Sequence, residues 1–169
     1  MTTLINYGWR WLKVHHDRRD NWIGLLSFGF FIMLFALFFI IVPNYGAKVV
    51  DFLEDFKLKE VASNVFLPTP EGHHQVVYQT VTNFCIVFGL FQFFILALRL
   101  YFRSSVSKVA ETVSNIVLWL GAVYMFNLLL SRAATWFPFI GGLVAVVGFS
   151  IVARNLIKLL FWRRSSQTQ

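Results

Sequence analysis

The sequence predicts an all-α membrane protein that crosses the bilayer four times. Four long, mostly apolar runs contain no charged residue, and basic residues flank them. Of the 169 residues, 57% are hydrophobic and only 14% are charged, whereas soluble domains typically carry about 25% charged residues. A soluble core of this size could not bury so much apolar surface. We therefore expect a single membrane domain over residues 1–169.

The four uncharged runs have the length that a spanning helix needs. At about 1.5 Å of rise per residue, about 20 residues cover the ~30 Å hydrocarbon core. The runs are continuous rather than alternating, which favours helices over a β-barrel. They comprise Trp22–Val42, Val76–Leu98, Thr112–Ser131 and Ala133–Ala153. With flanking residues that can extend the helices, the predicted spans cover about 22–42, 76–102, 112–131 and 134–158.

The first span has recognisable boundaries. Asp20 or Asn21 can cap its N-terminus, and the turn-forming stretch 43–46 (Pro-Asn-Tyr-Gly) ends it. It starts later and runs longer than the apolar core of a secretory signal, so we expect it to remain uncleaved. Before it, Leu4–His16 mixes apolar and basic residues. This composition favours a helix lying on the inner membrane surface, with a frayed tail as the alternative.

The external loop, residues 43–75, is the one sizeable segment predicted outside the bilayer. Apolar residues recur with i, i+3, i+4, i+7 spacing from Val49 to Phe56, which predicts an amphipathic helix over Ala47–Lys59. This helix would either cap the end of the bundle or provide a docking surface for a protein partner. The sequence does not separate these two roles.

The later boundaries predict a close hairpin between the last two spans. Prolines at 68 and 70 delay the second helix, so its start can stand outside the membrane. One of three serines, Ser104, Ser105 or Ser107, can cap the third helix. The connection 131–134 is short, so we expect spans three and four to be antiparallel neighbours in a four-helix bundle.

Basic residues are distributed unequally between the two sides of the predicted membrane domain. The side with the N-terminus, the loop between spans two and three and the C-terminus carries 11 Lys and Arg residues, and the other side carries 4. The positive-inside rule therefore places both termini in the cytoplasm of a multi-pass cell-membrane protein. Because these bases border apolar spans, the formal charge of +7 indicates a membrane surface rather than nucleic acid.

Three amide side chains stand out inside the spans. Gln92 lies among phenylalanines, while Asn115 and Asn127 lie 12 residues apart in the third span. Polar groups are costly in lipid, so they usually face protein or water. These amides either line a path or ligand site, or form interhelical hydrogen bonds worth roughly 0.6–2 kcal/mol each.

A second group of candidates lies at the predicted cytoplasmic ends of the spans. Arg99 and Arg154 can extend long side chains to the headgroups. Glu111 is the only acid near this rim after the first span, so we predict an ion pair of Glu111 with Arg99, Arg103 or Arg154. The pair would join spans two to four, or alternatively bind an ion or a headgroup.

The fourth span carries a stripe of small residues. Gly141, Ala145 and Gly148 follow i, i+4, i+7 spacing, and small side chains let another helix approach closely. The stripe would pack either within the chain or against a second copy in a homo-oligomer.

Several enzyme and transporter classes are disfavoured by what the sequence lacks. A single cysteine, Cys85, excludes an intramolecular disulfide, a multi-cysteine zinc site and a CxxC redox centre. No acid lies in the middle of a span, which argues against a proton-coupled carrier built on an embedded glutamate. The pairs His15-His16 and His73-His74 are adjacent, unlike the i, i+4 pair of a zinc helix. We expect no metal and no other cofactor.

Two stretches of the second and third spans resemble small uncharacterised archaeal membrane proteins. They run from Asn83-Phe84-Cys85 to Ala97-Leu98-Arg99 and from Ala110 to Asn115. The resemblance implies four spans and no particular activity, so it assigns no role to any residue.

These features favour a non-enzymatic membrane component with a structural, assembly or accessory role and no catalytic residue. A small transporter or channel acting as an oligomer is the second hypothesis, and it requires a hydrated cleft that reaches Gln92, Asn115 and Asn127. A lipid-acting enzyme that uses Glu111 and the neighbouring bases is the third.

Overall fold

The computed structural model describes residues 2–62 and 64–165, and the side chains of 21–60, 64 and 66–161. This part of the chain forms five helices and one two-stranded sheet. The elements are α1 (Thr2–Ile41), α2 (Tyr45–Glu54), β1 (Phe56–Ala62), β2 (Val65–Pro70), α3 (Gln75–Tyr101), α4 (Val106–Leu130) and α5 (Trp136–Ser165).

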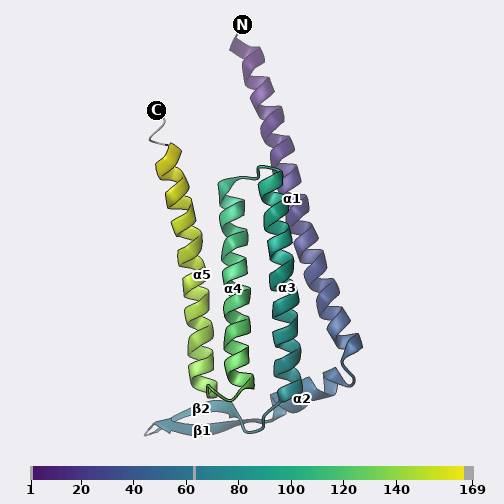
Figure 1. The fold of residues 1–169 in the computed structure, drawn as a ribbon, viewed down its shortest axis with the longest axis vertical. Helices are drawn as coiled ribbons and strands as arrows, with labels where there is room; N and C mark the ends of the chain where they lie inside the picture. The colour runs from purple at the N-terminus through teal and green to yellow at the C-terminus, as the bar shows by residue number, and fades with distance from the viewer. Residues whose placement is uncertain (1, 63, 166–169) are drawn as a thin grey trace.

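Four of the helices are long and apolar enough to cross a membrane, which confirms the predicted fold class. The candidate spans are Asn21–Ile41, Gln75–Tyr101, Val106–Leu130 and Trp136–Phe161. The start of α1 and the end of α5 lie at one end of the molecule, called here the terminal end, and the sheet lies across the other, called the hairpin end (Figure 1). An even number of crossings brings the two termini to the same side.

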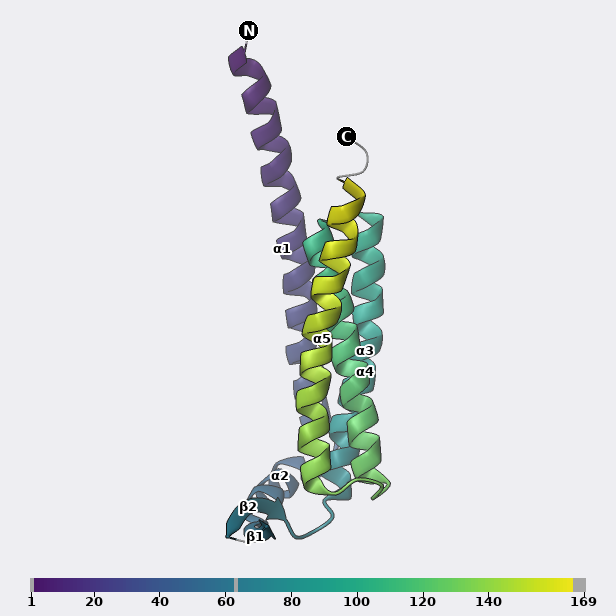
Figure 2. The same cartoon turned by 90° about the vertical axis from the view of Figure 1, so that its left-hand side faces the viewer.

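The helices form an open arrangement rather than the closed four-helix bundle that we expected. Helix α4 packs extensively on α3 and on α5, while α1 packs mainly on α3. Helices α5, α4 and α3 lie in a row, and α1 stands to one side of that row (Figure 2). Because α1 and α5 each have one main neighbour, most of their apolar surface is left uncovered by the chain.

Helix α1 is continuous from Thr2 to Ile41 and extends well beyond its spanning segment. The helix predicted at Leu4–His16 is confirmed, but it continues the line of the span and does not turn along a membrane surface (Figure 1). The predicted cap at Asp20 or Asn21 is wrong, because both residues lie inside α1. No glycine or proline follows His16 before the span, so nothing in this stretch breaks the helix.

The external segment is a short helix followed by a β-hairpin. Helix α2 ends at Glu54, so the helix predicted over Ala47–Lys59 is wrong in its second half. Strand β1 pairs antiparallel with β2, beginning with Phe56 opposite Pro70. From Phe56 to Glu60 most side chains alternate between apolar and charged, and this period of two is typical of a strand.

Two short loops join the last three helices through the same backbone turn. An arginine with positive φ follows each helix, Arg103 at 52° and Arg132 at 58°. In both loops the N–H of the residue after the arginine donates to the carbonyl five positions earlier. These bonds are Ser104 to Arg99 at 2.8 Å and Ala133 to Leu128 at 2.9 Å. This Schellman-type ending reverses the chain within a few residues. Helices α4 and α5 are therefore antiparallel neighbours, as predicted.

Aromatic rings form much of the contact between α1, α3 and α4. Phe31 of α1 lies edge-on to Phe84 and Phe88 of α3, with ring centroids 5.3 Å apart in both pairs. Trp119 of α4 lies 4.9 Å from Phe88. A Cβ on Gly89 would come within 3.4 Å of the Trp119 Cβ, so the missing side chain lets α3 and α4 approach here.

Candidate functional site

The intramembrane amide of Gln92 is buried and joins two helices. Only 2% of the residue is exposed, and its Nε2 donates a hydrogen bond to Ser27 Oγ of α1 at 3.0 Å. The two residues are 65 positions apart in the sequence, so the bond is a long-range link between α1 and α3. This geometry matches the interhelical hydrogen bond that was one of the two interpretations of Gln92.

The two asparagines do not join Gln92 in one cluster. Asn127 is exposed, and its Nδ2 donates to the Val123 carbonyl of its own helix at 3.0 Å. Asn115 is half-buried and, 12 residues earlier on α4, lies about 18 Å away along the helix axis. These three amides therefore do not line a single cleft.

At the terminal end, Arg99 folds into the loop between α3 and α4. The residue is 7% exposed, and its Nη1 donates to the backbone carbonyl of Lys108. Thr112 Oγ1 donates to the same carbonyl at 3.0 Å, and the Glu111 carboxylate lies 3.6 Å from Lys108 Nζ. The Arg99 hydrogen bond thus attaches the first turn of α4 to α3, whereas the Thr112 bond lies within α4.

Arg154 of α5 lies near the same level of the molecule. Ser114, one turn from Glu111, donates to the carbonyl of Ser150, one turn before Arg154, at 2.7 Å. Within the described part of the chain, the enclosed Nε of Arg154 has no hydrogen-bond partner. The predicted ion pair of Glu111 with Arg99, Arg103 or Arg154 stays a prediction.

The small-residue stripe lies on the exposed side of α5. A Cβ added at Gly141 or Gly148 would meet no atom within 4 Å, and Ala145 between them is exposed. The close approach of α4 and α5 uses other glycines instead. A Cβ on Gly121 would overlap Val146, and one on Gly142 would overlap Met125. Within the described part of the chain, therefore, no other helix packs on the stripe.

At the hairpin end, Asp55 connects the end of α2 to the segment before α3. Its Oδ2 accepts the Gly72 N–H at 2.5 Å and is hydrogen-bonded to His74 Nε2 at 2.9 Å. Its backbone carbonyl also accepts the N–H of Glu71 at 3.4 Å. A Cβ on Gly72 would lie 3.1 Å from Asp55 Oδ2, so this approach favours glycine. These four residues, Asp55, Glu71, Gly72 and His74, are called here the Asp55 clasp.

Hydrogen bonding favours the ionised form of the Asp55 carboxyl. The Gly72 N–H, and then His74, hold the pKa of the Asp55 carboxyl below its ordinary value of 3.8. The Lys57 and Glu71 side chains form an exposed ion pair at 2.7 Å beside it. Next to the clasp is a hollow of about 230 Å³ whose lining includes Lys48, Asp51 and His73. Charges of both signs meet there, so the hollow does not select one class of ion.

The two histidines of the pair 73–74 point to different neighbours. His74 contacts Asp55 and lies 5.3 Å from the Phe52 ring, whereas the His73 ring lies 5.7 Å from that of Tyr78. They do not act as a paired ligand in this conformation. The side chains of His15 and His16 lie outside the described residues.

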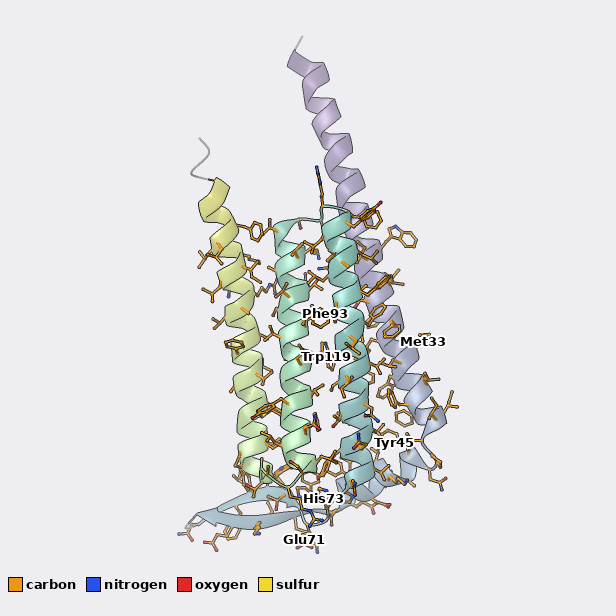
Figure 3. All side chains as sticks on the ribbon, viewed as in Figure 1. Met33, Tyr45, Glu71, His73, Phe93 and Trp119 are labelled. Atoms are coloured by element: carbon orange, nitrogen blue, oxygen red, sulfur yellow. The ribbon has the colours of Figure 1, made fainter. Side chains whose placement is uncertain are left out.

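An apolar cavity of about 320 Å³ lies between α1, α3 and α4, with Tyr45 of α2 at one end. Burial raises the pKa of the Tyr45 phenol, so its hydroxyl stays neutral near pH 7. Figure 3 shows Tyr45 at the hairpin end and Trp119 farther up, between α3 and α4. Sequence reasoning missed this cavity, because its lining comes from four separate elements and consists of residues that also suit a lipid-facing surface.

No protein-family model, no curated protein and no solved structure matches the chain. The resemblance to small archaeal membrane proteins therefore stays a prediction, and the functional argument rests on the residues themselves.

Proposed function

We propose that this integral membrane protein is a non-enzymatic accessory or assembly component that presents the outer face of α5 to a helix of another membrane protein. The observation that carries the proposal is the open arrangement of the helices, in which α4 is the one main neighbour of α5. Its outer face also carries the stripe of Gly141, Ala145 and Gly148, which the described residues leave uncovered. Small residues let a partner helix approach closely.

The polar interior supports the same proposal. Gln92 is engaged with Ser27, and Ser114 with the Ser150 carbonyl, so these groups serve to hold helices together. A transport path has less support, because Asn127 is bonded to its own helix and lies far from Asn115. A lipid-acting enzyme would need a reactive group, and the Glu111 carboxylate is partnered by Lys108.

The distribution of basic residues supports a matching orientation. We infer that the terminal end, with 11 Lys and Arg residues, faces the cytoplasm of the cell membrane and that the hairpin end, with 4, faces outward. The Asp55 clasp and the hairpin then form an external cap, which offers a second surface for a partner.

The proposal is tested by affinity purification from native membranes in a mild detergent. We expect the wild-type chain to retain a membrane protein that Gly148→Leu, which adds bulk to the stripe, releases. The matched control is Val147→Leu, because Val147 is also exposed on α5 but lies off the stripe. Retention of the same partner by Gly148→Leu, or the absence of any retained protein from wild type, would contradict the proposal.

A further inference from the structure

The apolar cavity extends from the hairpin end to about the middle of the candidate spanning helices. Tyr45 lies just beyond the end of α1, outside the candidate span. Cys85 lies ten residues into α3, which corresponds to a depth of about 15 Å. Because the hydrocarbon core is ~30 Å thick, the cavity covers about the depth of one leaflet. Its length therefore suits a lipid chain that enters from the hairpin-side leaflet.

The chemistry of the lining selects hydrocarbon over water. Eight of the twelve lining side chains are aromatic, and none is charged. The Thr80 hydroxyl is already used, since it donates to the Val76 carbonyl of its own helix at 2.7 Å. Besides this hydroxyl, only Tyr45, Cys85 and Trp119 bring a polar side-chain group to the lining, and Tyr45 lies at the other end from Trp119. An ordered water needs two to four polar partners. Its volume of about 320 Å³ lies within the usual range of small-molecule sites, roughly 300–1,000 Å³.

Ring contacts brace the cavity at both ends. At the deep end Phe31 lies edge-on to Phe84, and Trp119 lies 5.9 Å from Phe84. At the surface end Phe39 lies edge-on to Tyr45, with the ring centroids 5.0 Å apart. These contacts oppose collapse of α1 onto α4. Since α1 packs mainly on α3, the side of the cavity between α1 and α4 faces the surrounding lipid.

We propose that the cavity between α1, α3 and α4 is a binding site for one acyl chain of a phospholipid from the hairpin-side leaflet. The chain lies between the phenylalanines of α1 and the Cys85 and Ala122 walls, with the Tyr45 ring at the hairpin end of the cavity. This site does not depend on the proposed partner surface of α5, which lies on a different helix.

The test uses a phosphatidylcholine that carries a photoreactive diazirine midway along one acyl chain. The full-length protein is reconstituted in vesicles that contain this lipid, illuminated, and mapped by peptide mass spectrometry. We expect labelling of Thr80–Cys85 to exceed, severalfold, the labelling of Val144–Val152, much of which is exposed on α5 and reports contact with bulk lipid. Equal labelling of the two segments would overturn the proposal.

A space-filling variant separates a specific site from general lipid contact. Ala122→Leu extends a side chain into the cavity and should reduce the labelling of Thr80–Cys85 severalfold, while Val144–Val152 stays labelled. The matched control, Ala97→Leu, adds the same bulk at an exposed position of α3 that does not line the cavity. If Ala122→Leu fails to fold by circular dichroism, Cys85→Met fills the cavity from α3 instead. Unchanged labelling in a folded filled variant would overturn the site.

A free fatty acid with the same diazirine identifies the source of the chain. We expect the phospholipid to label Thr80–Cys85 without added fatty acid. If the fatty acid labels Thr80–Cys85 and the phospholipid does not, the assignment to a phospholipid is overturned.

Discussion

Two arginines occupy backbone positions that usually belong to glycine. Arg103 and Arg132 have positive φ at the ends of α3 and α4. For a residue with a Cβ, this left-handed conformation costs about 1–2 kcal/mol because the Cβ crowds the next carbonyl. No residue pattern predicted these turns, since helix-ending glycines are absent from both loops. The pairing of the N–H groups with late helix carbonyls offsets the cost.

Replacing one of these arginines should stabilise the protein. Arg132 is exposed, so Arg132→Gly removes the Cβ strain and loses little packing. Part of the gain is cancelled by the greater freedom of glycine in the unfolded chain, leaving an increase of about 0.5–1 kcal/mol in the free energy of unfolding. Detergent titration followed by circular dichroism measures the change. Arg132→Ala keeps the Cβ and serves as the control, and an equal gain in both variants would assign the effect to charge.

The Asp55 clasp should depend on pH in a defined direction. The folded-state pKa of Asp55 lies below its ordinary value of 3.8, so its stabilising effect is present above that value and is lost as the pH falls through the lower folded pKa. The hydrogen-exchange rate of the Gly72 amide is compared at each pH with the rate in an unstructured peptide of the same local sequence. The protection obtained in this way should decrease below about pH 4. Asp55→Ala should remove the protection at neutral pH. Asp51→Ala, on the exposed side of α2, should leave it intact.

At the scale of elements, aromatic rings and the Gln92–Ser27 hydrogen bond attach the described side chains of α1 to the other helices. The position of Gln92 inside a span predicted an interhelical hydrogen bond as one of two roles. The sequence did not identify Ser27 as its partner. Serine lies on many helix faces without consequence, and only the packing of α1 on α3 brings Ser27 within 3.0 Å.

A double-mutant cycle measures this link. Gln92→Leu and Ser27→Ala should each lower the free energy of unfolding, and the coupling energy between them should be about 0.6–2 kcal/mol. Detergent-induced unfolding of the two single variants and the double variant provides the measurement. Asn127→Leu is the control, because the Asn127 amide is exposed and bonded within its own helix. Additive effects of the two substitutions would show that the hydrogen bond contributes nothing.

The β-hairpin shows where periodicity alone is ambiguous. The spacing from Val49 to Phe56 fits a helix, and it overlaps the alternation that begins at Phe56. Asn64, with φ of 66°, turns the chain between β1 and β2, and asparagine tolerates this conformation better than most residues. The alternating charges after Phe56 together with this asparagine are the signal that could have predicted the hairpin.

At the scale of the whole molecule, composition predicted the spanning helices closely but could not predict how they pack. The candidate spans begin and end within a few residues of the uncharged runs, except that α4 starts six residues earlier and the span of α5 ends eight residues later. In lipid, however, helices are apolar on all sides, so hydrophobicity does not mark the inner face. Gly121 and Gly142 face neighbours, whereas Gly141 and Gly148 do not, and this difference emerges only from the structure.

The orientation of the molecule can be tested by cysteine labelling in a Cys85→Ser background. A membrane-impermeant maleimide added to intact cells should label His73→Cys at the hairpin end and should not label Ser105→Cys at the terminal end until the membrane is opened. Both positions are exposed in the structure, so access depends on the side of the membrane alone. The reverse pattern would contradict the inferred orientation.

The short loops after α3 and α4 also have a consequence for the order of folding. Helices α3, α4 and α5 follow one another in the chain and contact their sequence neighbours, so each pair can form as soon as both helices are inserted. Contacts between segments close in sequence form fastest, whereas the α1–α3 contact must first close a loop that includes α2 and the hairpin. During synthesis α1 is made before α3, so it lacks its main neighbour until α3 is inserted. Helix α1 is thus expected to stay unpaired in the bilayer for a time, and the segment that contains α2 and the hairpin keeps α3 close enough to pack on it.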